Sequence, residues 1–142
     1  MEKIAVYGSG TIGSCEATLI IGHGIPCTVI GHSERGLERC RRAVARNWDD
    51  LIANGLAAED NKTAALALLT VTNDPAALAG CTYVFEAVAE GAAEKQAVYE
   101  TIAKYAESDA VAHTIVVYSI APAASSRAAI SATVARFWPM AT

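Results

Sequence analysis

A glycine-rich turn that follows the first apolar run constrains this chain more than any other feature. Residues 4–7 are apolar, and Gly8, Gly10 and Gly13 then stand in G-x-G-x-x-G spacing before an apolar-rich segment over residues 11–21. This order predicts a buried strand, a tight turn and a helix. In such a turn the first glycine leaves the strand, the second lets a phosphate approach the backbone, and the third lets the helix pack against the strand. The same glycines also occur in turns that hold no ligand, so both interpretations stay open at this point.

A second strand, predicted at Cys27–Ile30, completes a parallel and right-handed β-α-β unit. The helix of this unit would turn its free N–H groups and its positive dipole end toward a pyrophosphate. The candidates for binding that pyrophosphate are Gly8, Ser9, Gly10, Thr11, Ile12 and Gly13. At the end of the second strand such units carry a carboxylate for the adenosine ribose, and this chain has none there. The candidate residues at that position are Gly31, His32, Ser33 and Arg35.

The remaining chain alternates between segments of helical and strand character. We expect a long helix from Ser33 to the stop signal Asn54-Gly55, and a second helix over residues 57–69 that forms a hairpin with it. The other expected strands are 69–72, 83–88, part of 111–119 and 133–138, and the other expected helices are 75–79, 91–105 and 121–132. This pattern predicts an α/β fold, a doubly wound parallel sheet (Rossmann fold) with a helical hairpin inserted between strands 2 and 3. Residues 1–142 are expected to form a single dinucleotide-binding domain.

The long helix has two different faces. Its apolar residues recur at three- and four-residue spacing, which predicts a buried stripe made of Leu37, Cys40, Val44, Trp48, Leu51 and Ile52. Its basic residues fall largely on the other side, and these are Arg35, Arg39, Arg42 and Arg46. A basic helix face is most often a solvated surface. A phosphate site for a nucleotide is the alternative interpretation.

Composition excludes several classes of function. Hydrophobic residues make up 53% and charged residues 18% of the chain, which is typical of a globular protein with a core. The net charge of −4 argues against general nucleic-acid binding, and we expect no membrane span, because no apolar run is long enough. The four cysteines, Cys15, Cys27, Cys40 and Cys81, include no C-x-x-C pair. We therefore expect buried reduced thiols in helices or strands of a cytoplasmic protein, and no metal site.

Three stretches together resemble one known family. Residues 4–14 are similar to the opening of the 3-hydroxyacyl-CoA dehydrogenases (3-hydroxybutyryl-CoA dehydrogenase-like), and residues 85–90 followed by 95–99 are similar to a later motif of the same family. The resemblance covers roughly residues 3–107. It implies the family's N-terminal NAD-binding domain, with NAD or NADP lying across the carboxyl ends of the strands. It further implies that Glu90 and Lys95 lie near the nicotinamide ribose, and Ala87 and Val88 join them as candidate cofactor contacts.

The chain also departs from the family pattern. Gly31 stands where the family has Asp, a loss that removes the repulsion of a 2′-phosphate and makes NADP a candidate cofactor beside NAD. Residues 114–119 are almost wholly apolar where the family has its Asn-Thr-Ser-Ser loop. Arg136 stands where the family's catalytic His opens its motif, and the Glu that pairs with this His and the helical substrate and dimerisation domain would lie beyond Thr142. We therefore assign no catalytic residue and expect a truncated or degenerate member that forms a homo-oligomer or is completed by a partner chain.

Two hypotheses about function follow from the resemblance. In the first, the chain is the cofactor domain of an oxidoreductase of fatty acid metabolism that moves hydride between a nicotinamide and a 3-hydroxyacyl-CoA or 3-ketoacyl-CoA. In the second, it is a stand-alone module that binds a dinucleotide without turnover. A more distant third is a short-chain or 6-phosphogluconate-type reductase with another catalytic residue. His23 and His113 are expected to be structural, His32 lies at the adenosine end, and Glu90 could serve as a base by proximity alone.

Overall fold

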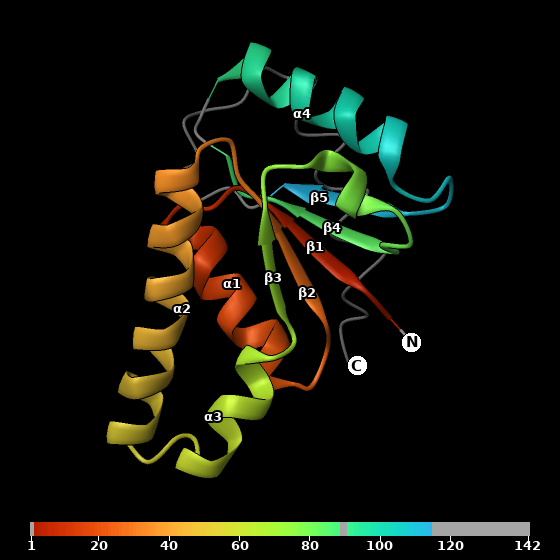
Figure 1. The fold of residues 1–142 in the computed structure, drawn as a ribbon. Coiled ribbons are helices and arrows are strands. Elements are labelled where there is room, and N and C mark those ends of the chain that lie inside the picture. Colours follow the sequence, from red (N-terminus) through yellow and green to blue (C-terminus); the bar gives the residue numbers. More distant parts are fainter. Residues whose placement is uncertain (1, 89–90, 115–142) are drawn as a thin grey trace, which may run out of the picture.

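The computed structural model describes residues 2–88 and 91–114, and these form a parallel sheet with helices on both faces (Figure 1). The strands lie in the order β3-β2-β1-β4-β5, and every neighbouring pair is parallel. Their bounds are β1 Ile4–Tyr7, β2 Cys27–Ile30, β3 Leu69–Thr72, β4 Tyr83–Glu86 and β5 Val111–Thr114. The prediction of a doubly wound parallel α/β sheet is therefore confirmed.

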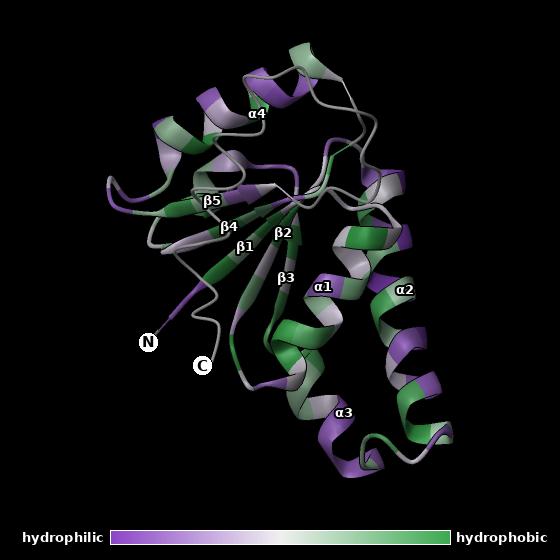
Figure 2. Cartoon of the chain, turned by 180° about the vertical axis from the view of Figure 1, so that it is seen from behind, coloured by the Kyte–Doolittle hydropathy of each residue, from purple (hydrophilic) through white to green (hydrophobic). Residues whose placement is uncertain are grey.

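Three helices cover one face of the sheet: α1 Thr11–Gly22, α2 Glu34–Ala53 and α3 Glu59–Leu66. α1 packs against both α2 and α3, and α2 and α3 also contact one another. Figure 2 shows α2 with hydrophobic residues on one side and hydrophilic residues on the other. The predicted stripe of α2 is buried at Leu37, Cys40, Val44 and Trp48, whereas Leu51 and Ile52 near the helix end are half-buried. The four buried side chains join Val6, Val29 and Ala17 in one apolar core.

The other face of the sheet carries a short 3-10 helix, η1 (Pro75–Leu78), and the helix α4 (Ala92–Tyr105). These two elements contact each other, and they enclose a second core with Ala5, Val84 and Val98 among its members. Adjacent residues of a strand point to opposite faces. Because both faces are covered, the strands read as apolar runs, and all four residues of β2 are buried.

Most of the predicted elements are confirmed, with corrections at their ends. Ser33 caps α2 with its side chain, and Asn54 caps its C-terminus before Gly55, which has φ +71°. The helix predicted over residues 57–69 is wrong at both ends, since α3 covers only Glu59–Leu66 before the chain enters β3. The strand predicted over residues 83–88 ends at Glu86, where the Val88 N–H turns back to bond the Glu86 side chain.

The predicted elements at 121–132 and 133–138 and the larger part of 111–119 lie outside the described residues. In the part of the chain that the structure describes, no helix combines the length and the apolar composition that a membrane span requires.

Candidate functional site

The carboxyl ends of four adjacent strands lie in one row. The register pairs Ile30 with Tyr7, Tyr7 with Glu86, and Glu86 with Thr114. The strand that follows β1 in the sequence lies on one side of it, whereas β4 lies on its other side, so the winding reverses between β1 and β4. In open parallel sheets a ligand binds in the crevice outside the carboxyl ends at this reversal point. The edge between β1 and β4 is therefore the candidate site.

Two of the predicted glycines are needed for close packing at this edge. Gly8 has φ +130°, and a Cβ built on it would lie 2.4 Å from the carbonyl oxygen of Ala87. A Cβ on Gly13 would lie 1.9 Å from the carbonyl oxygen of Gly8. The turn out of β1 is thus packed between the chain after β4 and the first turn of α1, and only glycine fits at both places.

Gly10 is different, because a Cβ on it would meet no atom within 4 Å. Gly10 is the N-cap of α1, and its carbonyl oxygen accepts hydrogen bonds from both the backbone N–H (2.9 Å) and the hydroxyl (2.8 Å) of Ser14. The preceding N–H groups of the helix have no intrahelical acceptor, and no acidic side chain occupies the first turn. This open space before a helix N-terminus suits a phosphate group.

At the end of β2 the absence of a Cβ at Gly31 makes room for Ser9. A Cβ on Gly31 would lie 2.7 Å from the Oγ atom of Ser9 and 2.6 Å from the Cδ2 atom of the buried Leu37. The Ser9 hydroxyl also lies 3.1 Å from the Cβ position of Gly36. Gly31 therefore has a packing role as well, because the glycine loop and the start of α2 pack together where a side chain at Gly31 would lie.

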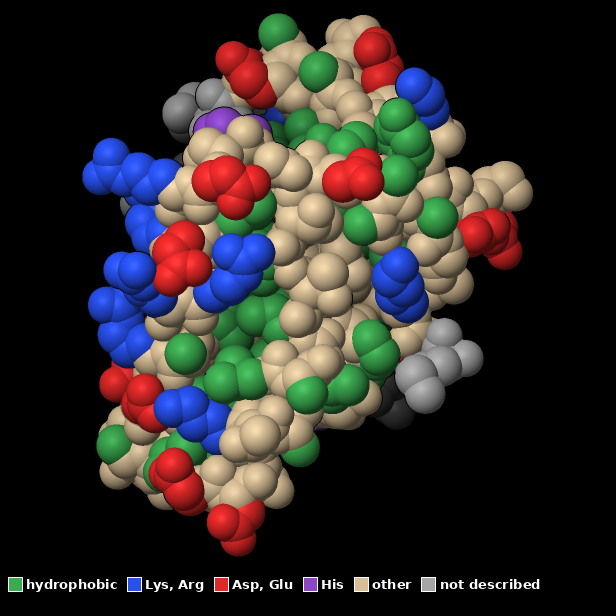
Figure 3. Space-filling model, viewed as in Figure 1, with side chains coloured by type: hydrophobic (Ala, Val, Ile, Leu, Met, Phe, Trp, Pro, Cys, Tyr) green, Lys and Arg blue, Asp and Glu red, His purple; other side chains and the backbone are tan. Residues whose placement is uncertain are grey.

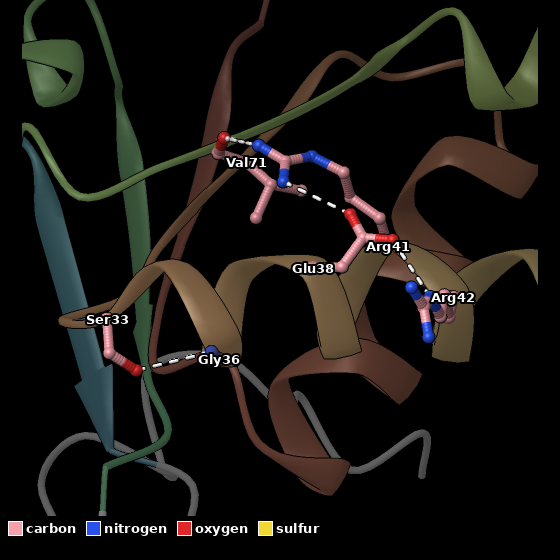
Figure 4. Close-up of polar contacts among 6 residues, drawn as sticks. All are labelled: Ser33, Gly36, Glu38, Arg41, Arg42 and Val71. Carbon is pink, nitrogen blue, oxygen red and sulfur yellow. Dashed lines mark hydrogen bonds and ion pairs between the residues drawn. The ribbon is translucent and has the colours of Figure 1, made fainter.

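The start of α2 presents hydroxyl and guanidinium groups near the same place. The Ser33 Oγ atom accepts a hydrogen bond from the Gly36 N–H at 3.2 Å (Figure 4), and its own hydrogen is left to donate to a ligand. His32 and Arg35, the predicted donors, have exposed side chains. The guanidinium of Arg39, one of the four arginines of the predicted basic face, reaches to 3.9 Å from the Cβ position of Gly36, so Arg39 is a further candidate at this place.

The predicted basic face of α2 is exposed to solvent. Figure 3 shows Lys and Arg side chains gathered along the edge of the molecule where α2 lies. Part of their charge is neutralised, because Glu38 forms ion pairs with Arg41 at 3.7 Å and with Arg42 at 2.8 Å (Figure 4). Arg41 also donates to the carbonyl oxygen of Val71 at 2.9 Å. For most of its length this face is therefore a solvated surface.

On the other side of the reversal point, a buried carboxylate connects three elements. Glu86 ends β4 and its side chain is fully buried. Its Oε1 atom accepts from the Val88 N–H at 2.8 Å, and its Oε2 atom accepts from Lys95 Nζ and from Thr114 Oγ1, each at 2.9 Å. The Tyr99 hydroxyl is hydrogen-bonded to Thr114 Oγ1. Lys95, predicted from the resemblance alone, is thereby held at the same edge of the sheet as the glycine loop.

The predicted residues on both sides of the reversal meet at Ala87. Its N–H donates to the carbonyl oxygen of Tyr7 at 2.8 Å, and its carbonyl packs against Gly8. Val88 follows it and is half-buried. Glu90, residues 115–119 and Arg136 lie outside the described residues, so the expectations placed on them stay predictions.

The histidines and cysteines show one correction. His23 caps the C-terminus of α1 and His113 lies in β5 with its ring against Phe85. Three cysteines are buried, and burial together with neighbouring thiols and Glu16 raises the pKa of Cys27 to about 12. The prediction that all four are buried in helices or strands is wrong for two, since α1 turns Cys15 outward to solvent and Cys81 lies just before β4. Among the described residues no group of three metal-ligating side chains occurs.

The sequence patterns did not indicate the roles of Glu86, Tyr99 and Thr114. A signal for Glu86 was present, because a lone carboxylate inside an apolar strand must find hydrogen-bond donors when it is buried. No comparable signal existed for Tyr99 and Thr114, since their meeting depends on how α4 lies against β5.

The parallel sheet, the glycine turn at its reversal point and the helix N-terminus beside it define a dinucleotide-binding domain. The sequence model of the family described as "3-hydroxyacyl-CoA dehydrogenase, NAD binding domain" matches residues 3–131. The chain therefore belongs to this family, whose cofactor is NAD.

Known relatives agree with this assignment. The chain is 28% identical over 99 residues to a 3-hydroxybutyryl-CoA dehydrogenase of Mycobacterium tuberculosis, an alignment that covers 70% of this chain and 35% of that protein. The crystal structure of M. tuberculosis FadB2 is similar with a TM-score of 0.77 and 27% identity, over 80% of this chain and 40% of that one. The 3-hydroxybutyryl-CoA dehydrogenase of Escherichia coli gives a TM-score of 0.74 and 25% identity, over 80% of this chain and 24% of that one. The chain thus spans about a third of the length of the curated relatives that it matches.

Proposed function

We propose that this chain holds NAD across the carboxyl ends of β1 and β4, as the cofactor-binding part of a 3-hydroxyacyl-CoA oxidoreductase. The pyrophosphate lies over Gly10, the adenosine ribose lies at Gly31 to Ser33, and the nicotinamide ribose extends toward Val88 and Lys95. One observation carries this proposal: a Cβ on Gly10 meets open space, whereas a Cβ on Gly8 or Gly13 meets backbone. The turn is packed on both sides and open only where a phosphate would sit.

The residues of this chain supply binding and orientation. When bound, NAD accepts a hydride from a substrate carbon and NADH returns one. Oxidation of a hydroxyl also needs a general base. In the described part of the chain His23 is at the far end of α1, His113 packs on Phe85, and His32 is exposed at the adenosine side. We therefore propose that this chain binds the cofactor and has no more than trace activity on acetoacetyl-CoA by itself, which a steady-state assay with NADH and NADPH measures.

A substitution at Gly10 tests the binding site. Gly10→Val places a branched side chain where the pyrophosphate would lie, and its Cβ would meet no protein atom within 4 Å. Isothermal titration with NADH should show most of the affinity lost, while circular dichroism shows an unchanged fold. The matched control is Gly22→Ala at the other end of α1, where a Cβ makes only an ordinary 3.7 Å contact with Trp48. Unchanged affinity in Gly10→Val would overturn the proposed site.

We further propose that the chain has lost the usual discrimination against NADPH. Gly31 provides no carboxylate to repel a 2′-phosphate, while Ser33 and Arg39 offer donors at this position. The measurement is a pair of dissociation constants for NADH and NADPH at one ionic strength. A wild type that binds NADH about tenfold tighter, roughly 1.4 kcal/mol, would contradict the proposal.

Restoring the carboxylate sharpens this test. Because a Cβ on Gly31 would collide with Ser9, Gly31→Asp is made in a Ser9→Gly background, with Ser9→Gly alone as the control. The Leu37 methyl that lies 2.6 Å away is the end of a flexible side chain and can turn aside. The double variant should regain about tenfold preference for NADH, the scale of charge-assisted hydrogen bonds.

The remaining expectations concern partners and location. We propose that the chain acts on acyl-CoA substrates only together with a second copy or a partner chain, since it matches only 35% of the length of the curated relative. Sedimentation at tens of micromolar measures this, and a clean monomer there contradicts self-association. A cytoplasmic location is supported by four free thiols, all within the described residues.

A further inference from the structure

Glu86 is the one charged side chain among the fully buried residues of the described part of the chain. Its neighbours on the same face of the sheet are apolar, and they include Val84, Val98 and Ile102. Burying a charge is costly, and apolar residues of similar volume often replace a buried ion pair with no loss of stability. Packing alone therefore does not call for a carboxylate at this position.

The three groups that donate hydrogen bonds to the Glu86 carboxylate all lie near the proposed site. Its two oxygens accept from the Val88 N–H, the Lys95 ammonium and the Thr114 hydroxyl. Because the Thr114 hydroxyl donates to Glu86, the bond between Tyr99 and Thr114 must run from the Tyr99 hydroxyl to Thr114 Oγ1. Donors from β5, from α4 and from the turn after β4 thus meet on one carboxylate.

The position of Glu86 places this cluster beside the glycine loop. Glu86 is paired in register with Tyr7, the last residue of β1. The next residue, Ala87, bonds Tyr7 through its N–H and touches Gly8 through its carbonyl. The bond from the Val88 N–H to Glu86 fixes the peptide that follows. The bonds of Glu86 therefore fix the chain on the β4 side of the reversal point, and among the described residues no hydrogen bond of its side chain reaches the end of β2.

Lys95 is held by the same carboxylate with its side chain 19% exposed. Its Nζ atom has three donors and a mobile stem, so its direction depends on the group it bonds. We infer that Glu86 is a positioning residue of the nicotinamide half of the site, acting through Lys95 and the Val88 amide. This inference rests on the proposed cofactor site, and it confines the effect of Glu86 to one half of the dinucleotide.

The test compares a whole ligand with half of it. Dissociation constants for NADH and for ADP, which lacks the nicotinamide and its ribose, are measured by titration on the full chain. Glu86→Gln keeps the shape of the side chain but removes the charge that orients Lys95. We expect NADH binding to weaken about tenfold and ADP binding to stay within about twofold, the scale of one charge-assisted contact. The ratio of the two constants is the readout, because general destabilisation lowers both affinities together.

Further variants separate positioning from stability. Val98→Ala removes a buried side chain one turn after Lys95 in α4. It should leave the ratio of the NADH and ADP dissociation constants unchanged. Lys95→Gln should shift the ratio as Glu86→Gln does, and the double variant should shift it no further, because both act through one contact. If Glu86→Gln is poorly folded, Thr114→Val, which removes a donor from the same oxygen, gives the same readout with a smaller shift.

The outcomes distinguish this inference from the proposal beneath it. A wild type that binds neither NADH nor ADP overturns the proposed function. A wild type that binds both, with Glu86→Gln and Lys95→Gln leaving the ratio unchanged, overturns the positioning role alone. A ratio that shifts equally in Val98→Ala also overturns it, since the effect would then be due to loosened packing of α4.

Discussion

The two sides of the reversal point build the same edge of the sheet in different ways. On the β1–α1 side the edge is formed by backbone atoms, and it depends on glycines that carry no side chain. Gly8 and Gly13 pack against backbone carbonyl groups, and the space beside Gly10 is empty of protein atoms. On the β4–α4 side it is formed by side chains, through the bonds of Glu86 with Lys95 and Thr114. The first side depends on steric fit and the second on a buried charge. Each should therefore fail under a different kind of substitution.

The cores beneath the two sides differ in the same sense. The core under α1 and α2 includes long apolar side chains such as Leu37 and Trp48, and α1 and α2 pack closely on each other. On the other face, within the described residues, α4 lies over the sheet beside the short helix η1, and α4 buries Val98 and Ile102. Only these two residues of α4 are buried, and the bond from Lys95 to Glu86 is a second, polar attachment of α4 to the sheet.

The largest effect is expected from Gly13→Ala, which breaks the steric side. The added Cβ would lie 1.9 Å from the Gly8 carbonyl oxygen, a backbone atom that cannot turn aside. We expect a loss of more than about 3 kcal/mol in the free energy of unfolding, above the usual range for overpacking. Urea denaturation measures it, with Gly10→Ala as the control, which should lose no more than about 1 kcal/mol because alanine is a poorer N-cap than glycine. Equal midpoints for both variants would contradict the steric account.

The next effect concerns the charged side. Lys95→Met leaves Glu86 buried without its cation, and such losses cost about 3–5 kcal/mol; we expect the lower end because Lys95 is partly exposed. Combining it with Glu86→Gln should recover most of the loss, since no buried charge is then left unpaired. The double variant and both single variants are compared by urea denaturation. A purely additive result would show that the pair is not coupled.

A smaller effect is expected from alkaline pH, which acts on a buried thiol in the core under α1 and α2. Burial, followed by the neighbouring thiols, raises the pKa of Cys27 to about 12 in the folded chain, against an ordinary value of 9.0. From pH 9 upward the unfolded thiol loses its proton while the folded thiol keeps it, so stability is full below pH 9 and falls as pH rises toward 12. The expected slope from this residue is about 1.4 kcal/mol per pH unit. That slope is reached well above pH 9, so Cys27→Ala should reduce the decline between pH 9 and 10 by about 1 kcal/mol, and parallel curves would contradict this.

The smallest effect is local to the start of α2. Ser33→Ala removes the side-chain acceptor of the Gly36 N–H, and an N-cap of this kind contributes about 1 kcal/mol. Ser33→Asp should retain the stability because it can also cap, yet it should repel the 2′-phosphate of NADPH. Thermal denaturation and paired titrations with NADH and NADPH measure the two properties separately. A Ser33→Ala variant as stable as the wild type would remove Ser33 from the helix cap.

Local signals in the sequence determined a large part of this fold. Four strands begin as predicted, and β1, β2 and β3 also end as predicted, because each is a short run of apolar and β-branched residues followed by turn-forming residues. Ser33 and Asn54-Gly55 set the ends of α2, since capping depends on residues within one turn. The three glycines were identified by spacing, because a turn from strand to helix needs them at fixed separations. The ends of α3 and β4 were missed, since neighbouring strands and a side chain set them.

Only the tertiary structure decided which residues of these segments contact one another. The packing of the loops and of α1 leaves no room for a side chain at Gly8 beside Ala87, and it places Ser9 in the space beside Gly31. The same packing turns Cys15 toward solvent. The cluster on Glu86 needs the strand order that sets β4 between β1 and β5, and the register that sets Glu86 beside Thr114. These contacts join residues far apart in the chain, and a local pattern carries no information about distances that arise only when the sheet is assembled.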